Sequence, residues 1–174
     1  MRNKKNILII GGTGFLGYHL MKLCISKYNV SSISLSRPLK DRKVKKVKYI
    51  KCDISKKGNW TKEFKGKCYV FHLASLADIV PSIQNPKKYF ESNVNGTLNV
   101  LEACRKARII KFIYSASSSC YGIPKTYPTK EFEKINPMYP YALTKKMGED
   151  LIIHWSKVFG IPFISLRLFN VYGT

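Results

Sequence analysis

Residues 6–17 read NILIIGGTGFLG, an apolar run followed at once by Gly11, Gly14 and Gly17. The run predicts a buried strand over residues 6–10. Glycines at this spacing after a strand let the backbone approach a pyrophosphate, whose charge is stabilised by the N-terminus of the helix that follows. A tight structural turn without a ligand is the alternative interpretation. The stretch therefore indicates a dinucleotide-binding unit.

The rest of the chain alternates short apolar runs with longer amphipathic stretches. Further strands are expected at 32–36, 47–52, 68–73, 111–115 and 162–168, and helices at 15–26, 87–106 and 141–159. This alternation predicts helical crossovers on a parallel sheet. We expect an α/β fold, a Rossmann-like doubly wound parallel sheet with helices on both faces, as one NAD(P)-binding domain over residues 1–174.

The helix over 141–159 should present two different sides. A stripe at helical spacing predicts its buried face, formed by Leu143, Met147, Leu151, Trp155 and Val158. Tyr141, Lys145 and Gly148 lie on a different side, which is expected to face a cleft.

Composition narrows the class of protein. No apolar run approaches the roughly 20 residues that span a bilayer, and the apolar stretch after the basic N-terminus is short and meets glycines instead of a signal cleavage site. The five cysteines are odd in number and include no C-x-x-C pair, as expected for reduced thiols in a cytoplasmic protein. The three histidines form no metal-binding pattern, so no metal is expected.

The formal net charge of +21 raises the question of a nucleic-acid partner. Lysines are spread along the whole chain, with one cluster over residues 40–51, and no aromatic residues interleave with them as in a base-stacking groove. A solvated lysine-rich surface is the preferred interpretation. An anionic small substrate is compatible with either.

Tyr141 and Lys145 stand one helical turn apart and share a helix face. A cation within about 4–6 Å favours the phenolate form of tyrosine, which lowers its pKa from about 10 towards the working pH of a general base. With the glycines upstream, this pair indicates an enzyme that performs redox chemistry.

Taken together, the motifs resemble the extended short-chain dehydrogenase/reductase family, in its nucleotide-sugar epimerase and dehydratase branch. The matching segments cover nearly the whole chain in the expected order: residues 11–17, 53–54, 71–74, 93–97, 114–122, 141–145 and 167–173.

The resemblance implies three catalytic residues. Tyr141 would be the acid/base, Lys145 would lower its pKa and hold the nicotinamide ribose, and Ser117 would contact the reacting sugar oxygen. Related 4,6-dehydratases carry Asp and Glu after that serine, whereas this chain has Ser118 and Ser119. The expected activity is therefore 4-epimerisation of a UDP-hexose type nucleotide sugar, by transient C4 oxidation and hydride return, for polysaccharide synthesis.

Further residues are assigned by the same resemblance. The expected cofactor-binding residues are Gly11, Gly14, Phe15, Leu16, Gly17, Arg37, Asp53, Ile54, Leu73, Ala74, Asn93, Ser115, Tyr141, Lys145 and Phe169. The expected substrate-binding residues are Ser117, Ser118, Tyr141 and Asn170.

Two departures from the family pattern matter. Relatives that prefer NAD end the second strand with a carboxylate, but here that strand leads to Arg37, so NADP is an option beside the expected NAD. Relatives are also nearly twice as long, so we expect the C-terminal substrate domain to be missing and the 174 residues to bind dinucleotide with little turnover.

The expected partners are a nucleotide-diphosphate sugar and, in the complete enzyme, a second copy; neither a membrane nor a nucleic acid is expected. Two further interpretations remain open. One is a dehydratase, C5 epimerase or reductase on the same scaffold, and the other is a non-catalytic dinucleotide- or RNA-binding module.

Overall fold

The computed structural model describes residues 4–173. Its strands are β1 (Asn6–Ile10), β2 (Asn29–Ser34), β3 (Lys48–Lys51), β4 (Tyr69–His72), β5 (Lys111–Ser117) and β6 (Phe163–Leu168). Its helices are α1 (Phe15–Cys24), α2 (Ile79–Gln84), α3 (Pro86–Tyr89), α4 (Gly96–Ala107) and α5 (Pro140–Phe159). A π-helical turn, Phe90–Asn95, joins α3 to α4, and short 3₁₀ turns lie at Lys40–Arg42, Asn59–Phe64 and Ser118–Tyr121.

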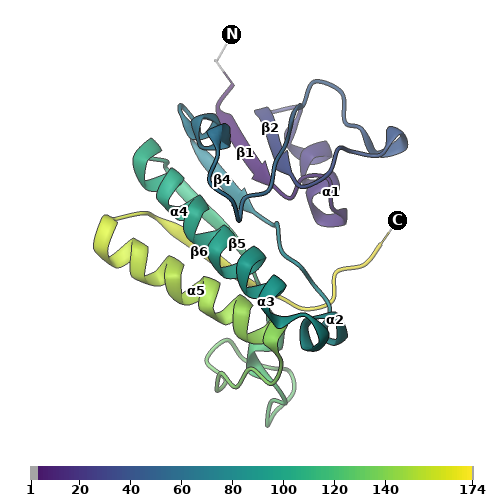
Figure 1. The fold of residues 1–174 in the computed structure, drawn as a ribbon, viewed down its shortest axis with the longest axis vertical. Coiled ribbons are helices and arrows are strands. Elements are labelled where there is room, and N and C mark those ends of the chain that lie inside the picture. The colour runs from purple at the N-terminus through teal and green to yellow at the C-terminus, as the bar shows by residue number, and fades with distance from the viewer. Residues whose placement is uncertain (1–3, 174) are drawn as a thin grey trace.

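The six strands form one parallel sheet in the order β3-β2-β1-β4-β5-β6 (Figure 1). The chain runs outward from β1 to β3, crosses to β4, and runs outward again to β6. This is the doubly wound order, which leaves a ligand crevice at the carboxyl ends of the strands where the direction reverses. The predicted fold class is confirmed, and the crevice lies between β1 and β4.

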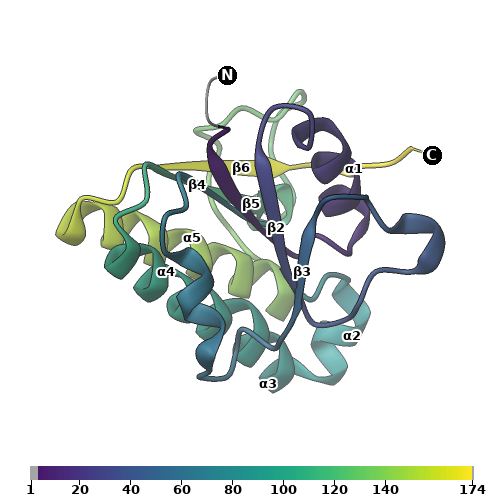
Figure 2. The ribbon, with the colours of Figure 1, turned by 90° about the horizontal axis from the view of Figure 1, so that it is seen from above.

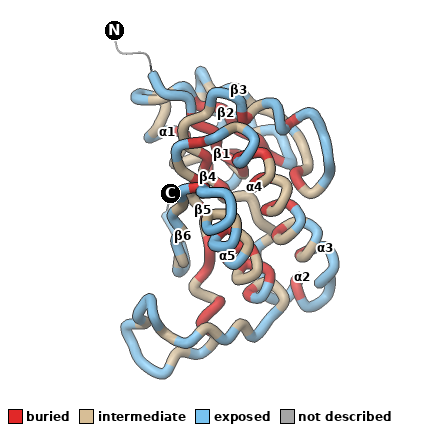
Figure 3. The backbone as a smooth tube through the Cα atoms, turned by 90° about the vertical axis from the view of Figure 1, so that its left-hand side faces the viewer, coloured by how far each residue is buried: buried red, intermediate tan, exposed pale blue. Residues whose placement is uncertain are grey.

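Helices cover both faces of the sheet, with α1 on one side and α4 and α5 together on the other (Figure 2). The side chains of β1 alternate between the two faces. Ile7 and Ile9 pack with Met21 of α1, whereas Leu8 and Ile10 belong to the larger core beneath α4 and α5. Figure 3 shows the buried residues concentrated along the strands, while the loop between β5 and α5 extends away and is mostly exposed.

The predicted elements are present, with bounds that agree or differ by up to three residues. The helix expected over residues 87–106 is interrupted by the π-helical turn at Phe90–Asn95. A π turn inserts an extra residue into the helical ladder and is frequent at functional sites. Nothing in the hydrophobic pattern of this stretch predicted the interruption.

The buried face of α5 differs from the expected stripe. Leu143 and Val158 are 40% and 54% exposed, whereas Lys145, Gly148 and Glu149 are buried. The reason is that α5 packs on β5 with this polar and small-residue side, where Gly148 lies against Tyr114. The expected stripe was therefore right only in part: Leu151 and Trp155 pack against the core, but Leu143 and Val158 do not. The Lys145 side of the helix is its inner side.

All five cysteines are free thiols. Within residues 4–173, no helix has the length and apolar character needed to cross a lipid bilayer.

Candidate functional site

The glycine-rich turn connects β1 to α1 at the crevice. Gly11 has a φ of 88°, and a Cβ atom there would lie 2.6 Å from the backbone nitrogen of Ala74. A Cβ atom at Gly17 would lie 2.3 Å from the Gly11 carbonyl oxygen. Gly14 precedes α1 and is exposed. The turn thus packs tightly on the end of β4 while its outer side stays open at a helix N-terminus, where an anion is favoured.

A first cavity of about 220 Å³ lies at the carboxyl ends of the strands on the β2 and β3 side of the switch point. Its lining includes six of the predicted cofactor residues, namely Gly11, Gly14, Asp53, Ile54, Leu73 and Ala74. The Asp53 carboxylate is oriented through Oδ1, which accepts hydrogen bonds from the Ser55 backbone nitrogen at 2.9 Å and the Ser55 hydroxyl at 2.7 Å. Oδ2 remains as an acceptor for a ligand.

A second, larger cavity of about 750 Å³ lies beside the first, and Leu73 and Ser75 line both. It brings together the three predicted catalytic residues, Ser117, Tyr141 and Lys145. Leu16, Ser115, Ser118, Phe169 and Asn170 also line it. One continuous path therefore leads from the glycine turn to the Tyr141 helix.

Lys145 is buried where α5 packs against β5. Its Nζ atom lies 4.5 Å from the centre of the Tyr114 ring, a cation–π arrangement. Burial disfavours the ammonium and lowers the pKa of Lys145 from 10.5 to about 7. The Tyr114 hydroxyl donates to the Lys145 carbonyl at 3.3 Å, and burial raises the pKa of Tyr114, so this residue stays a neutral phenol. A lysine that titrates near neutral pH is typical of a functional site.

Ser117 ends β5 and is also buried. Its hydroxyl donates to the Ser119 hydroxyl at 3.0 Å and accepts from the Ser119 backbone nitrogen at 3.2 Å. This fixes the Ser117 oxygen at the rim of the second cavity. Ser119 therefore acts as a support for Ser117.

Asn93 connects the loop after β4 to α5. Its side-chain oxygen accepts from the Leu76 backbone nitrogen at 2.8 Å, and its amide nitrogen donates to the Leu76 carbonyl and to the Thr144 hydroxyl. Asn93 thus ties the loop after β4 to α5 one residue before Lys145. It was predicted to bind the cofactor, but it lines neither cavity.

Three more predicted cofactor residues also lie outside the cavity linings: Phe15, Gly17 and Arg37. Arg37 is exposed, and the hydroxyl residues Ser34 and Ser36 line the first cavity at the end of β2 instead. These serines were not predicted, because the family pattern has a carboxylate at the end of this strand. Tyr114 was not predicted either, and its only signal is its place in β5 next to Ser115.

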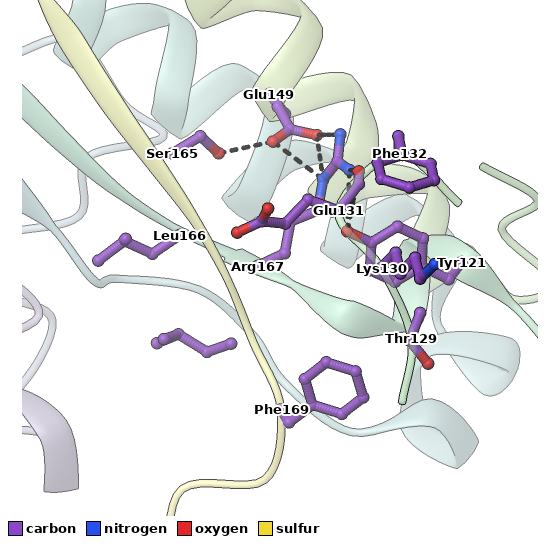
Figure 4. Close-up of a pocket in the computed structure, with 11 residues that line it drawn as sticks. Tyr121, Thr129, Lys130, Glu131, Phe132, Glu149, Ser165, Leu166, Arg167 and Phe169 are labelled. Atoms are coloured by element: carbon purple, nitrogen blue, oxygen red, sulfur yellow. Dashed lines mark hydrogen bonds and ion pairs between the residues drawn. The ribbon is translucent and has the colours of Figure 1, made fainter. Parts of the chain in front are cut away.

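Glu149 and Arg167 form a partly buried ion pair in a further cavity, which shares Leu168 and Phe169 with the second cavity (Figure 4). Glu149 accepts from Ser165 at 2.6 Å and from Arg167 at 3.0 Å, so α5 is tied to β6. Arg167 also donates to the Tyr121 hydroxyl at 3.0 Å. Burial opposes the charge of Arg167, but its hydrogen bonds to Tyr121 and Glu149 and the charge of Glu149 raise its pKa overall. Arg167 therefore stays charged, and its hydrogen bonds to Glu149 hold β6 against α5.

Residues 7–174 match the model of the NAD dependent epimerase/dehydratase family. The chain belongs to this family. Among curated members, it is 36% identical to a putative UDP-glucose 4-epimerase of Methanocaldococcus jannaschii over 96% of this chain and 56% of that protein. It is 32% identical to the UDP-glucose 4-epimerase of Lactobacillus helveticus over 96% of this chain and 52% of that protein.

Solved structures of this NAD-dependent family share the fold. One is a UDP-N-acetylglucosamine 4-epimerase of Methanobrevibacter ruminantium in complex with UDP-N-acetylmuramic acid, with a TM-score of 0.91, 34% identity, and coverage of 98% of this chain and 56% of that chain. Another is the UDP-glucose 4-epimerase of Brucella ovis in complex with NAD, with a TM-score of 0.89, 32% identity, and coverage of 95% and 52%. The chain thus spans about half the length of the epimerases that it matches.

The described residues fit the family's dinucleotide. Neither Gly11 nor Gly17 has room for a side chain. The backbone at Gly11 contacts Leu73 and Ala74 at the end of β4, and the backbone at Gly17 contacts the glycine turn itself. The outer side of the turn, at Gly14, stays exposed. The two cavities meet at Leu73 and Ser75, at the switch point where such sheets bind ligands. Within residues 4–173, no group of three His, Cys, Asp or Glu side chains is arranged to hold a metal ion.

Proposed function

We propose that the chain is the cofactor-binding part of an NAD-dependent nucleotide-sugar 4-epimerase that acts on a UDP-hexose. The observation that carries this proposal is the second cavity, in which Ser117, Tyr141 and Lys145 converge where the dinucleotide path ends. The similarity to UDP-sugar 4-epimerases over nearly the whole chain supports the same reaction.

The chemistry assigned to these residues is proton transfer and positioning. Tyr141, as phenolate, takes the proton from the C4 hydroxyl of the sugar, and Ser117 holds the same oxygen through a hydrogen bond. Lys145, when charged, favours the phenolate. Bound NAD would supply the reversible hydride acceptor that oxidation and reduction at C4 require.

The position of the serines favours epimerisation over dehydration. Dehydration needs an acid and a base beside the hexose, and Ser118 and Ser119 stand where carboxylates would supply them. Among the described residues that line the second cavity, Asp78 is the one carboxylate, and it belongs to the loop after β4 and not to the turn that follows Ser117.

NAD is the proposed cofactor in preference to NADP. The 2′-hydroxyl end of the site would be met by Ser34 and Ser36, whereas Arg37, the residue that could attract a 2′-phosphate, is outside the cavity. Calorimetric titration of the chain with each dinucleotide tests this. Tighter binding of NADP would reverse the assignment.

We also propose that the working enzyme is a cytoplasmic homodimer that pairs through α5. Its outer side exposes Leu143, Ile153 and Val158, and apolar side chains gathered on one helix face mark an interaction surface. Light scattering on the whole enzyme tests the dimer. A Leu143→Lys variant that remains dimeric would argue against this face.

The decisive experiment is Tyr141→Phe in the whole enzyme. Removal of the acid/base should lower UDP-hexose epimerisation by at least about 100-fold, with NAD binding retained because the glycine turn is untouched. Undiminished turnover would refute the proposal. For the 174 residues alone, we expect NAD binding with little turnover, and a robust epimerase rate would contradict that part.

A further inference from the structure

Although lysines are spread along the whole chain, six of them precede or begin four of the six strands: Lys4, Lys5, Lys46, Lys48, Lys67 and Lys111. Parallel strands all start at the same edge of a sheet, so these residues collect at the amino edge. This is the end of the molecule where the N-terminus lies and β1 begins (Figure 1). The site described above lies at the opposite, carboxyl edge, where Asp53 and Asp78 follow their strands.

At the amino edge these lysines surround a cavity. It has a volume of about 280 Å³ and is lined by Lys4, Lys46, Lys48 and Lys67 together with Tyr28 and Ser31. None of the described residues that line it is a carboxylate. Four cations around one concave surface repel one another, and a bound anion would relieve that repulsion.

Lys67 is the best anchored of the four. Its Nζ donates to the hydroxyl of buried Ser31 at 2.7 Å, which fixes the ammonium at the wall of the cavity. The Ser31 hydroxyl accepts this bond and keeps its own proton for a ligand. Burial lowers the pKa of Lys67, and the charge of Lys48 lowers it further, against the opposite effect of Glu63.

The charges at the cavity are poorly compensated. Lys48 is paired with Glu63 at 2.7 Å, but within residues 4–173 no carboxylate lies within salt-bridge distance of Lys4, Lys46 or Lys67. Lys46 lines the cavity from the turn before β3 with a φ of 65°, a conformation that residues with side chains adopt rarely.

The size and lining of the cavity define the ligand class. Cavities for drug-sized molecules start at about 300 Å³, so this one suits a smaller anion. Tyr28 is the aromatic residue in the lining, and its ring is engaged edge-on with Tyr69, at 6.3 Å between centroids, so it offers no platform for a stacked base. We propose that the amino edge of the sheet carries a second anion site, formed by Lys4, Lys46, Lys48 and Lys67, for a small phosphate anion such as pyrophosphate.

The experiment is calorimetric titration of the 174-residue chain with pyrophosphate, at low and at physiological ionic strength, with and without saturating NAD. The NAD arm is needed because the glycine turn also favours phosphate. Binding should persist with NAD present, and Lys67→Gln and Lys46→Gln should each weaken it about tenfold, the effect of one lost charge-assisted hydrogen bond. Lys87→Gln, at an exposed lysine of α3, is the matched control and should change nothing.

Three results would overturn the site. They are no binding to the unaltered chain, equal binding by the Lys67→Gln and Lys46→Gln variants, and loss of all binding when NAD is added. Binding of an RNA oligonucleotide that pyrophosphate does not displace would also reject a small-anion site, in favour of an extended nucleic-acid surface. If Lys67→Gln does not fold by circular dichroism, the exposed Lys46→Gln decides alone.

Discussion

Gly148 marks the closest approach between α5 and the sheet. A Cβ atom at this position would lie 2.4 Å from the Tyr114 hydroxyl oxygen. Gly148→Ala would gain up to about 1 kcal/mol of helix propensity, but overpacking a buried contact costs about 1–3 kcal/mol. We expect the variant to be less stable in urea unfolding and to bind NAD more weakly, because the displaced Tyr114 ring also contacts Lys145.

The double variant with Tyr114→Phe supplies the control. Without the hydroxyl oxygen, Gly148→Ala should lose most of its cost, since that oxygen is the nearest atom. Equal destabilisation in both backgrounds would mean that the clash is not the cause.

Asp78 has a φ of 80° and a ψ of 138° in the lining of the second cavity. Such a conformation is strained for any residue with a side chain, by about 1–3 kcal/mol. Asp78→Gly should therefore raise the thermal unfolding midpoint, while Asp78→Asn, which keeps the Cβ atom, should not. A gain in both variants would point to charge instead of backbone strain.

Much of the site could be predicted at the scale of single residues. Ser117, Tyr141 and Lys145 were predicted to act together, and the fold places them around one cavity. The role of Asn93 could not be predicted, because its partners, Leu76 and Thr144, are 17 and 51 residues away in the chain. Contacts at such separations depend on the crossing of elements, which local patterns do not specify.

At the scale of elements, most strands were predictable because they are short runs rich in apolar and β-branched residues, such as β1 and β4. The inner face of α5 was not. Hydropathy assigned the apolar side chains to the interior, but the sheet receives the side with Lys145, Gly148 and Glu149. That arrangement is stable because Gly148 allows close packing and Glu149 meets Arg167. For that reason, a helix whose site residues face the interior does not follow the usual pattern in which apolar side chains form the buried face.

The contact between β4 and α4 makes the fold sensitive to acid. His72 is fully buried, and burial, with a further effect of the Lys145 charge, lowers its pKa from 6.5 to about 3. Its Nε2 lies 2.9 Å from the Thr97 hydroxyl, which donates to the Asn93 carbonyl, so Nε2 must be the donor. Nδ1 has no partner among the described residues. A second proton there would find no acceptor.

Because His72 stays neutral in the folded chain, the free energy of unfolding should fall as the pH falls. Below pH 6.5 the unfolded chain binds a proton that the folded chain refuses, so stability should decrease from about 6.5 down to about 3, by about 1.4 kcal/mol per pH unit from this residue. His72→Gln should show a shallower decline in urea unfolding across this window. His154→Gln, at an exposed histidine, is the control. Identical slopes for all three proteins would exclude His72 as the cause.

At the scale of the whole molecule, the dominant property is the net charge of +21. Like charges destabilise the compact state, and salt screens them. We expect the thermal unfolding midpoint to rise between about 20 and 300 mM NaCl, with most of the gain at the lower concentrations. The same change in an uncharged osmolyte such as sucrose, or no change in salt, would show that self-repulsion is not limiting.

The two margins of the sheet differ. The outer strand β3 is short and carries Lys48 and Lys51, whereas β6 has six residues and exposes Ile164 and Leu166 at 42% and 44%. Lysines discourage pairing with another chain, while a longer apolar margin with free amide and carbonyl groups is a template for it. In concentrated solution, molecules of the 174-residue chain should add strands to one another at β6, and Ile164→Lys should keep them dispersed.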